Sequence, residues 1–201
     1  MGKLFAIEGT DGSGKQTQFK KLCERLTEDG IDFRTVSFPN YDSESSSLVK
    51  MYLSGKFGEN AKDVSPYIAS TFYAADRYTT ANMVHQSGKI SDPEERQKFL
   101  DWLLDYEFNL YGLPKPTRTF FLNMPTEYAI ELMKNRENKF THEQAKDIHE
   151  KDSNHLKDSY NAACSLVDKY DWYEVKCVKD NKIRTIEDIH EEIYEEVKKY
   201  I

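Results

Sequence analysis

The stretch "IEGTDGSGKQT" at residues 7–17 decides the fold. It fits the spacing G-x-x-x-x-G-K, in which Gly9, Gly14 and Lys15 are the fixed points. A short apolar run precedes it at residues 3–8, and helical spacing of apolar residues begins at Lys15. A glycine-rich loop between a strand and a helix directs backbone N–H groups at phosphate oxygens, and the helix N-terminus adds partial positive charge. The stretch therefore predicts a phosphate-binding loop, with Lys15 reaching the outer phosphates.

Two residues of this loop raise separate questions. The motif expects a Ser or Thr hydroxyl for Mg²⁺ after the lysine, but Gln16 stands there and Thr17 follows. A Gln carbonyl is also a hard oxygen donor, so Gln16, Thr17 or a bound water remain the alternatives for the metal. Asp11 places a carboxylate beside bound phosphates. This favours a role for Asp11 in accepting a hydrogen bond from a sugar hydroxyl or in orienting the metal. The alternative is a solvated loop tip.

Strands and helices alternate along the rest of the chain. Apolar or alternating patterns predict strands at residues 3–8, 31–38, 117–122 and 172–178. Periodic spacing and capping residues predict helices from Lys15, at 48–53, from Pro66, from Pro93, at 125–135, at 152–170 and after Thr185. This alternation is typical of an α/β fold with a parallel sheet and helices on its faces. The pattern gives no strand between Phe38 and Thr117.

Composition limits the class of protein. The 201 residues suit one domain, and the net charge of −7 argues against broad nucleic-acid binding, which needs a basic face. No apolar run approaches the roughly 18 to 20 residues of a membrane span. The three cysteines, Cys23, Cys164 and Cys177, are scattered and odd in number, which favours free thiols in a reducing cytoplasm.

Five segments in order resemble the thymidylate kinase family of P-loop nucleoside monophosphate kinases, over Lys3 to about Trp172. They are "IEGTDGSGKQTQ", "FPNYDSESSSLVKMYLSGKFG", "DRYTTANMVHQ", "GLPKP" and "KDIHEKD". The resemblance implies a P-loop kinase fold, normally with five parallel strands, and a mobile lid at about residues 136–150. It implies transfer of the γ-phosphoryl group of ATP to dTMP, giving dTDP and ADP in dTTP synthesis. It also implies Mg²⁺ as cofactor and a cytoplasmic homodimer.

The resemblance implies a role for each candidate residue. The ATP site would comprise Gly9, Thr10, Asp11, Gly12, Ser13, Gly14, Lys15, Gln16 and Thr17. The dTMP site would comprise Asp11 at the 3′-hydroxyl, Phe72 stacked on thymine, Arg77 at the base or phosphate, and Asn82 and Gln86 beside the base. The catalytic residues would be Lys15, Asp76, Arg77 and Arg136, and the metal ligands would be Gln16 and Asp76.

The lid carries further charged residues. Arg136, with Lys139 and Lys146, would lie over ATP, because the phosphate loop has no arginine among its variable positions. Arg136 is alternatively a charge at a helix C-terminus. For Lys139 and Lys146, and for His149 and Glu150, we favour solvated surface positions.

Two departures from the family pattern stand out. Residues 38–41 read Phe-Pro-Asn-Tyr, without the arginine that family members often carry after the second strand. "FYAADRYTTANMVHQ" at residues 72–86 is also too short, because one Ala-Asp-Arg serves both a base-reading helix and a strand that ends in Asp-Arg-Tyr. Either the complete polypeptide carries a segment between Phe72 and Asp76 that this sequence lacks, or recombination between similar segments removed it. We favour the first explanation.

Two other functions remain open. One is a kinase for another nucleotide or a deoxynucleoside. The other is a catalytically silent nucleotide-binding module, which the Gln16 substitution, the missing arginine and the short central segment favour.

Overall fold

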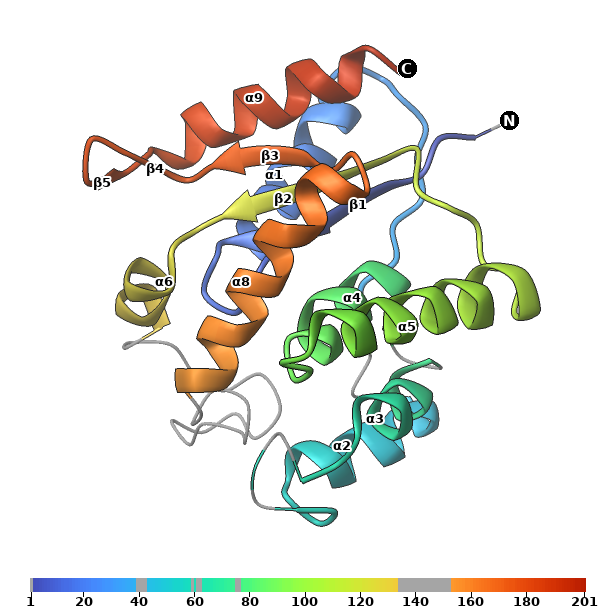
Figure 1. The fold of residues 1–201 in the computed structure, drawn as a ribbon. Coiled ribbons are helices and arrows are strands. Elements are labelled where there is room, and N and C mark those ends of the chain that lie inside the picture. Colours follow the sequence, from blue (N-terminus) through green and yellow to red (C-terminus); the bar gives the residue numbers. More distant parts are fainter. Residues whose placement is uncertain (1, 39–42, 59, 61–62, 75–76, 134–152) are drawn as a thin grey trace.

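A computed structural model describes residues 2–38, 43–58, 60, 63–74, 77–133 and 153–201. Within these ranges the fold is α/β, with a parallel three-stranded sheet flanked by helices (Figure 1). The strands are β1 (Phe5–Glu8), β2 (Arg118–Asn123) and β3 (Tyr173–Lys176), in the order β1-β2-β3. Three of the four predicted strands, including the one before the phosphate loop, are thus confirmed.

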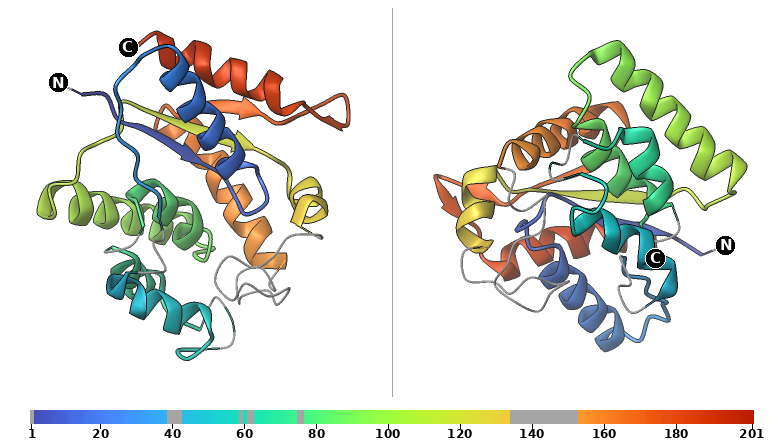
Figure 2. Two further views of the ribbon diagram at one scale, coloured as in Figure 1. Left: turned by 180° about the vertical axis from the view of Figure 1, so that it is seen from behind. Right: turned by 90° about the horizontal axis from the view of Figure 1, so that it is seen from below.

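Helices cover both faces of this sheet (Figure 2). One layer consists of α1 (Lys15–Glu28) and α9 (Ile186–Lys198), and the other contains α4 (Thr79–Ser87), α5 (Pro93–Leu104) and α8 (Ser153–Lys169). Successive side chains of β2 point to opposite faces, as strand geometry requires. Phe120 packs with the α1 and α9 side chains, whereas Phe121 packs with those of α4, α5 and α8.

A smaller helical unit lies beyond α4. It consists of a 3₁₀ turn (Glu44–Ser46), α2 (Ser47–Leu53) and α3 (Pro66–Tyr73). Its own core is formed by Val49, Tyr52, Leu53, Val64, Ala69 and Tyr73. Helix α3 packs on α4, so this unit is held beside the helix that follows the Asp-Arg-Tyr segment.

The predicted helix caps are confirmed. Ser65, Asp92 and Thr185 each accept a hydrogen bond from the backbone N–H three residues later. Helix α5 continues into a π-helical turn (Asp105–Leu110), which ends before "GLPKP". The remaining elements are α6 (Thr126–Met133) and the antiparallel pair β4 (Val178–Lys179) and β5 (Lys182–Ile183). None of the helices in the described ranges is both long and apolar enough to cross a membrane.

The predicted strand at residues 31–38 is wrong. The segment has no regular structure, and Phe33, Val36 and Phe38 are 40%, 70% and 46% exposed. A strand needs a neighbour to pair its backbone groups, and in the described part of the chain β1 pairs only with β2. The described sheet has three strands rather than five: residues 31–38 are irregular, and the described residues between α3 and α4 form no strand.

Candidate functional site

The phosphate loop lies between β1 and α1, as the sequence predicts. Gly12 and Gly14 adopt positive φ angles of 82° and 89°, a conformation that glycine favours. A Cβ atom at Gly12 would lie 2.5 Å from the Ala129 carbonyl oxygen of α6, so this position also requires glycine for space. The Lys15 Nζ atom donates hydrogen bonds to the carbonyl oxygens of Gly9 (2.6 Å) and Thr10 (2.9 Å). The ammonium therefore folds back over the loop.

A buried hydrogen bond joins the loop to α4. The Thr80 hydroxyl, in the first turn of α4, donates to Glu8 Oε1 at the end of β1 over 2.5 Å. Burial raises the pKa of Glu8, and the positive charges of Lys15 and Arg77 act in the opposite direction. Lys15 and Arg77 therefore both lie within electrostatic range of the Glu8 carboxyl. Two of the three cations that the sequence predicts for phosphoryl transfer thus act on the same carboxyl group.

Helix α4 carries further buried polar side chains after Thr80. Asn82 Nδ2 donates to Glu107 Oε1 over 2.9 Å, and both side chains are fully buried. Gln86 is also fully buried, and neither its Oε1 nor its Nε2 atom has a hydrogen-bond partner among the described residues. Buried amides without partners are unusual, because burial without a hydrogen bond costs free energy. Gln86 therefore lies in a position suited to bonding a ligand.

His85 links α4 to the phosphate loop. Burial lowers the pKa of its imidazole well below the ordinary value, as does the charge of Arg77, whereas Asp11 favours the charged form. Asp11, which is half-buried, thus lies within electrostatic range of α4. The His85 ring stacks on that of His155 in α8, with centroids 6.1 Å apart.

The remaining predicted dTMP residues lie around the helical unit. Arg77 is half-buried, and its guanidinium lies 3.8 Å from the centre of the Tyr73 ring. Its Nη1 atom has no hydrogen-bond partner in the described ranges. Phe72 is half-buried, with its ring centroid 5.2 Å from that of Phe57 and 6.3 Å from that of Tyr52. Its stacking on a base stays a prediction.

Several predicted positions lie outside the described residues. They are Asp76, Arg136, Lys139, Lys146, His149, Glu150 and the lid segment at about 136–150. Conversely, sequence reasoning missed four buried residues, Tyr52, His85, Lys89 and Glu107. For His85 and Lys89 a signal was available, because they are spaced i, i+4 on the same helical segment as Asn82 and Gln86. Tyr52 and Glu107 come from distant segments that carry no such signal.

The first turn of α1 carries the two oxygen donors that the sequence offers for a metal. Gln16 and Thr17 are both exposed there, directly after Lys15, so their oxygens are accessible from the loop. The described residues contain no cluster of three or more His, Cys, Asp or Glu side chains that could hold a metal ion. Mg²⁺ usually keeps several waters and binds one or two protein oxygens together with substrate phosphates. The donor set present at the loop fits that mode of binding.

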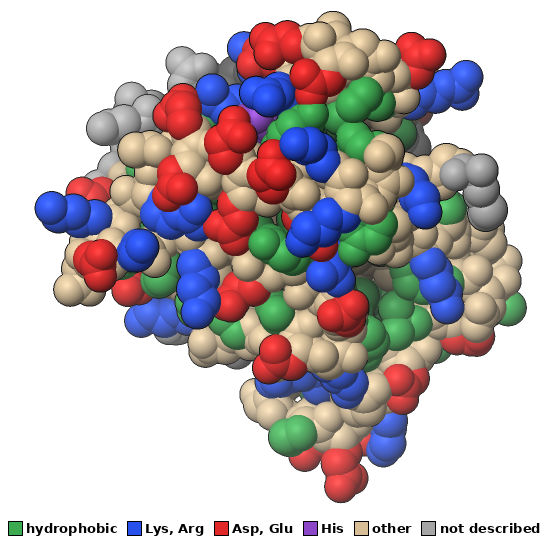
Figure 3. Space-filling view, turned by 90° about the horizontal axis from the view of Figure 1, so that it is seen from above, with side chains coloured by type: hydrophobic (Ala, Val, Ile, Leu, Met, Phe, Trp, Pro, Cys, Tyr) green, Lys and Arg blue, Asp and Glu red, His purple; other side chains and the backbone are tan. Residues whose placement is uncertain are grey.

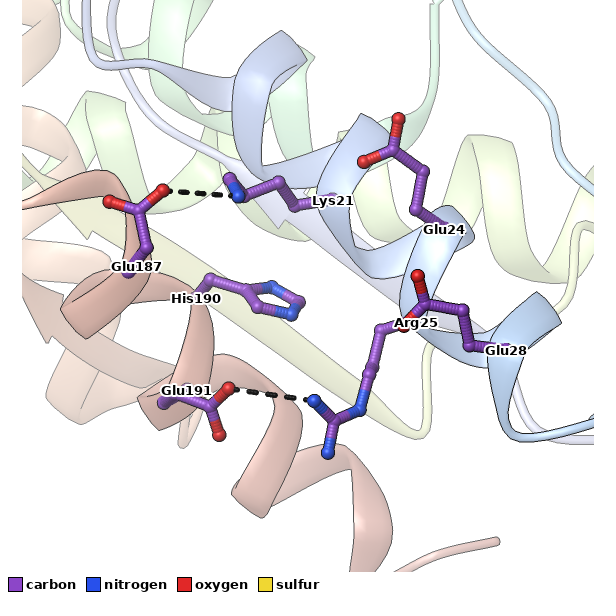
Figure 4. Close-up of a pocket in the computed structure, with 7 residues that line it drawn as sticks. All are labelled: Lys21, Glu24, Arg25, Glu28, Glu187, His190 and Glu191. Carbon is purple, nitrogen blue, oxygen red and sulfur yellow. Dashed lines mark ion pairs between the residues drawn. The ribbon is translucent and has the colours of Figure 1, made fainter.

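A hollow lies between α1 and α9 (Figure 4). Two ion pairs cross it, Lys21 with Glu187 (3.2 Å) and Arg25 with Glu191 (3.8 Å). Acidic and basic side chains also lie side by side over the face of the molecule shown in Figure 3. Because the charges in the hollow are already paired across the helices, we assign it to helix packing.

The parallel sheet and the glycine-rich loop between β1 and α1 are those of a P-loop nucleotide kinase. The sequence model of the thymidylate kinase family matches residues 7–90. A thymidylate kinase of Plasmodium falciparum is 26% identical over 216 residues, covering 98% of this chain and 90% of its own length. The thymidylate kinase of Mycobacterium tuberculosis is 28% identical, covering 66% of this chain and 71% of its own length. That of Homo sapiens is 27% identical, covering 61% of each. The chain is thus similar to thymidylate kinases, in one case over nearly its whole length.

The length of the Plasmodium falciparum alignment bears on the short central segment. It extends over 216 positions, whereas this chain has 201 residues in total. The relative therefore carries residues that have no counterpart here. This agrees with a chain that is shortened internally.

Proposed function

We propose that the protein transfers the γ-phosphoryl group of ATP to dTMP, giving dTDP and ADP. The observation that carries this proposal is the position of α4 against the phosphate loop, fixed by the bond between Thr80 and Glu8. Behind that bond, the buried Gln86 amide has no partner among the described residues. An acceptor bound along α4 would thus have its phosphate near the loop.

The amides of α4 suit a pyrimidine base. A carboxamide offers a donor and an acceptor side by side, which complement an imide N–H and a neighbouring carbonyl of thymine. Gln86 has both atoms free for such bonds within the described structure, and Asn82 has its Oδ1 free while Glu107 orients its Nδ2. Phe72 would stack on the base, and Asp11 would accept a hydrogen bond from the 3′-hydroxyl of the deoxyribose.

Phosphoryl transfer depends on positioning and on positive charge more than on covalent catalysis. Lys15 would hold the outer phosphates of ATP over the loop of residues 9–17, and Arg77 would approach from the other side of Glu8. Asp76 would orient the metal or the acceptor. Arg136, on a lid at about residues 136–150, would add charge when the lid closes over ATP.

Gln16 and Asp76 would hold Mg²⁺, with Thr17 as the alternative to Gln16. Bound Mg²⁺ would neutralise charge on the phosphate oxygens during transfer. We further propose a single domain over residues 1–201, which forms a homodimer in the cytoplasm and binds neither nucleic acid nor membranes. The homodimer follows the family resemblance, whereas the other features follow from the length, charge and composition of the chain.

The test is an acceptor panel. ADP production from ATP and Mg²⁺ would be measured with dTMP, dUMP, dCMP, AMP and thymidine, and we expect turnover to be highest with dTMP. Turnover of another acceptor without turnover of dTMP would reject the assignment. ATP binding by calorimetry, with no ADP produced in any mixture, would instead identify a silent module.

A further inference from the structure

Lys89 is a buried cation just beyond the end of α4. Its exposed fraction is 9%, and its Nζ atom donates a hydrogen bond to the Tyr52 hydroxyl of α2 over 2.6 Å. The same Nζ atom lies 5.0 Å from the centre of the Tyr52 ring. Lysine is almost never this deeply buried unless it is paired, because an isolated ammonium loses its hydration. Its burial therefore needs an explanation.

No carboxylate of the described residues pairs with Lys89. The Tyr52 hydroxyl accepts its hydrogen bond, and the charge of Arg77 acts on it. Burial and the charge of Arg77 together lower the pKa of Lys89 to about 7. A second positive charge beside a buried ammonium is unfavourable in the protein alone, whereas both charges would stabilise a bound anion.

Two tyrosine rings hold the two cations together. The Tyr52 and Tyr73 rings meet edge to face, with centroids 5.9 Å apart. Lys89 lies against the first ring and Arg77 against the second. Cation–π contact stabilises each charge without neutralising it. The arrangement thus keeps two positive groups available on one aromatic pair.

Electrostatic interactions connect this cluster to the phosphate loop. His85, one helical turn before Lys89, interacts electrostatically with Arg77 and with the loop residues Asp11 and Lys15. Arg77 also acts on Glu8 at the start of the loop. The segment at residues 38–41, which leads toward α2, contributes no basic side chain. Lys89 therefore adds positive charge to a group of residues that is linked electrostatically to the loop.

We propose that Lys89 binds the 5′-phosphate of the acceptor nucleotide, together with Arg77. The proposal rests on the proposed function, because it assigns a phosphate-binding residue to the same acceptor site. The charged ammonium would donate to a phosphate oxygen, as ammonium groups do in other phosphate sites. Tyr52 would hold the lysine side chain in position.

The first test compares ligands with and without the phosphate. Calorimetry would give the dissociation constants of dTMP and of thymidine for the wild type, Lys89→Met and Lys89→Arg. We expect Lys89→Met to weaken dTMP about 10- to 100-fold and to leave thymidine unchanged, because a charge-assisted hydrogen bond is lost. Lys89→Arg should restore most of the dTMP affinity. Lys98→Met is the matched control, since Lys98 is exposed on α5 and pairs only with Glu95.

The second test uses pH on the wild type, so it holds even where Lys89→Met fails to fold. Arg77 acts on Lys89 by its charge, and Tyr52 is the titratable group that accepts its hydrogen bond. Two further charged residues belong to neighbouring segments. Arg96 donates to the Ile90 carbonyl, and the backbone of Asp158 in α8 lies against Gly88. The phosphate of dTMP becomes a dianion above about pH 6, so its affinity should first rise. Above pH 7 the affinity should fall as Lys89 loses its proton, and Lys89→Arg should abolish that fall.

The outcomes separate the two proposals. An equal loss of dTMP and thymidine affinity in Lys89→Met would assign Lys89 a structural role and overturn the inference. Unchanged dTMP affinity in that variant, or a fall above pH 7 that persists in Lys89→Arg, would also overturn it. A wild type that turns over another acceptor and does not bind dTMP would refute the proposed function itself.

Discussion

The Thr80 hydroxyl donates a buried hydrogen bond to the Glu8 carboxylate over 2.5 Å. This contact joins the strand that precedes the phosphate loop to the helix that carries Asn82, His85 and Gln86. Residues 72 positions apart in the chain thereby face one another across a buried contact. The two halves of the candidate site depend on this bond for their relative position.

Glu8→Gln should reduce the pH dependence of stability. Burial raises the pKa of Glu8 above its ordinary value of 4.5, so the folded protein retains a proton that the unfolded chain releases as pH rises. The contribution of Glu8 to the free energy of unfolding therefore falls from pH 4.5 upward, until the folded pKa is passed. Glutamine keeps an acceptor for Thr80 and has no such proton to lose.

The measurement is the midpoint of thermal unfolding between pH 4.5 and 8. We expect a shallower decline with pH for Glu8→Gln than for the wild type. Glu24→Gln is the matched control, because Glu24 is exposed on α1 and forms only a surface pair with Lys20. Parallel curves for Glu8→Gln and the wild type would contradict a raised pKa at Glu8.

Lys15→Met should lower the turnover number about 10²- to 10³-fold, a typical loss when one preorganised charge is removed from a transition state. The measure is ADP production at saturating ATP and dTMP. Lys20→Met removes an equal charge from an exposed position of α1 and should retain full activity. Near-normal turnover in Lys15→Met would show that the loop does not act on the transferring phosphate.

Gln16→Ala should raise the Mg²⁺ concentration needed for half-maximal activity about 10-fold, because loss of a residue that supports a metal commonly costs 10- to 100-fold in affinity or activity. The activity at saturating Mg²⁺ should recover in large part. Thr17→Ala is the matched variant, since Thr17 is the other exposed oxygen donor of that turn. A shifted Mg²⁺ requirement in Thr17→Ala alone would transfer the role to Thr17.

Phe121→Ala should destabilise the protein by about 3–5 kcal/mol, as large core truncations do. Phe121 is fully buried on the face of β2 that packs against α4, α5 and α8. Phe33→Ala should change the free energy of unfolding by less than about 1 kcal/mol, because Phe33 is 40% exposed. Urea unfolding of both variants provides the test. A loss of several kcal/mol in Phe33→Ala would show that residues 31–38 are buried as a strand after all.

The intact mass of the purified protein should exceed 23.5 kDa, the mass of the 201 residues, by a few kDa. A strand and its connection between Phe72 and Asp76 would account for the difference. Peptide mapping across residues 65–90 would locate the additional residues. A mass of 23.5 kDa would instead mean that the polypeptide lacks this strand.

The sequence by itself determined the features that depend on neighbouring residues. The phosphate loop follows from Gly9, Gly14 and Lys15 between an apolar run and a helical pattern. The helix starts at Pro66, Pro93 and Ile186 follow from local caps, because a capping side chain bonds a backbone N–H only three residues away. The strands β1, β2 and β3 follow from apolar runs between turn signals.

Only the tertiary structure decided what depends on distant partners. Residues 31–38 carry a strand pattern, yet a strand forms only where another strand satisfies its backbone hydrogen bonds, and the described chain brings none. The meeting of Lys89 with Tyr52, and of Asn82 with Glu107, joins segments 37 and 25 positions apart. Such contacts arise from helix packing, which side-chain spacing along one helix does not specify.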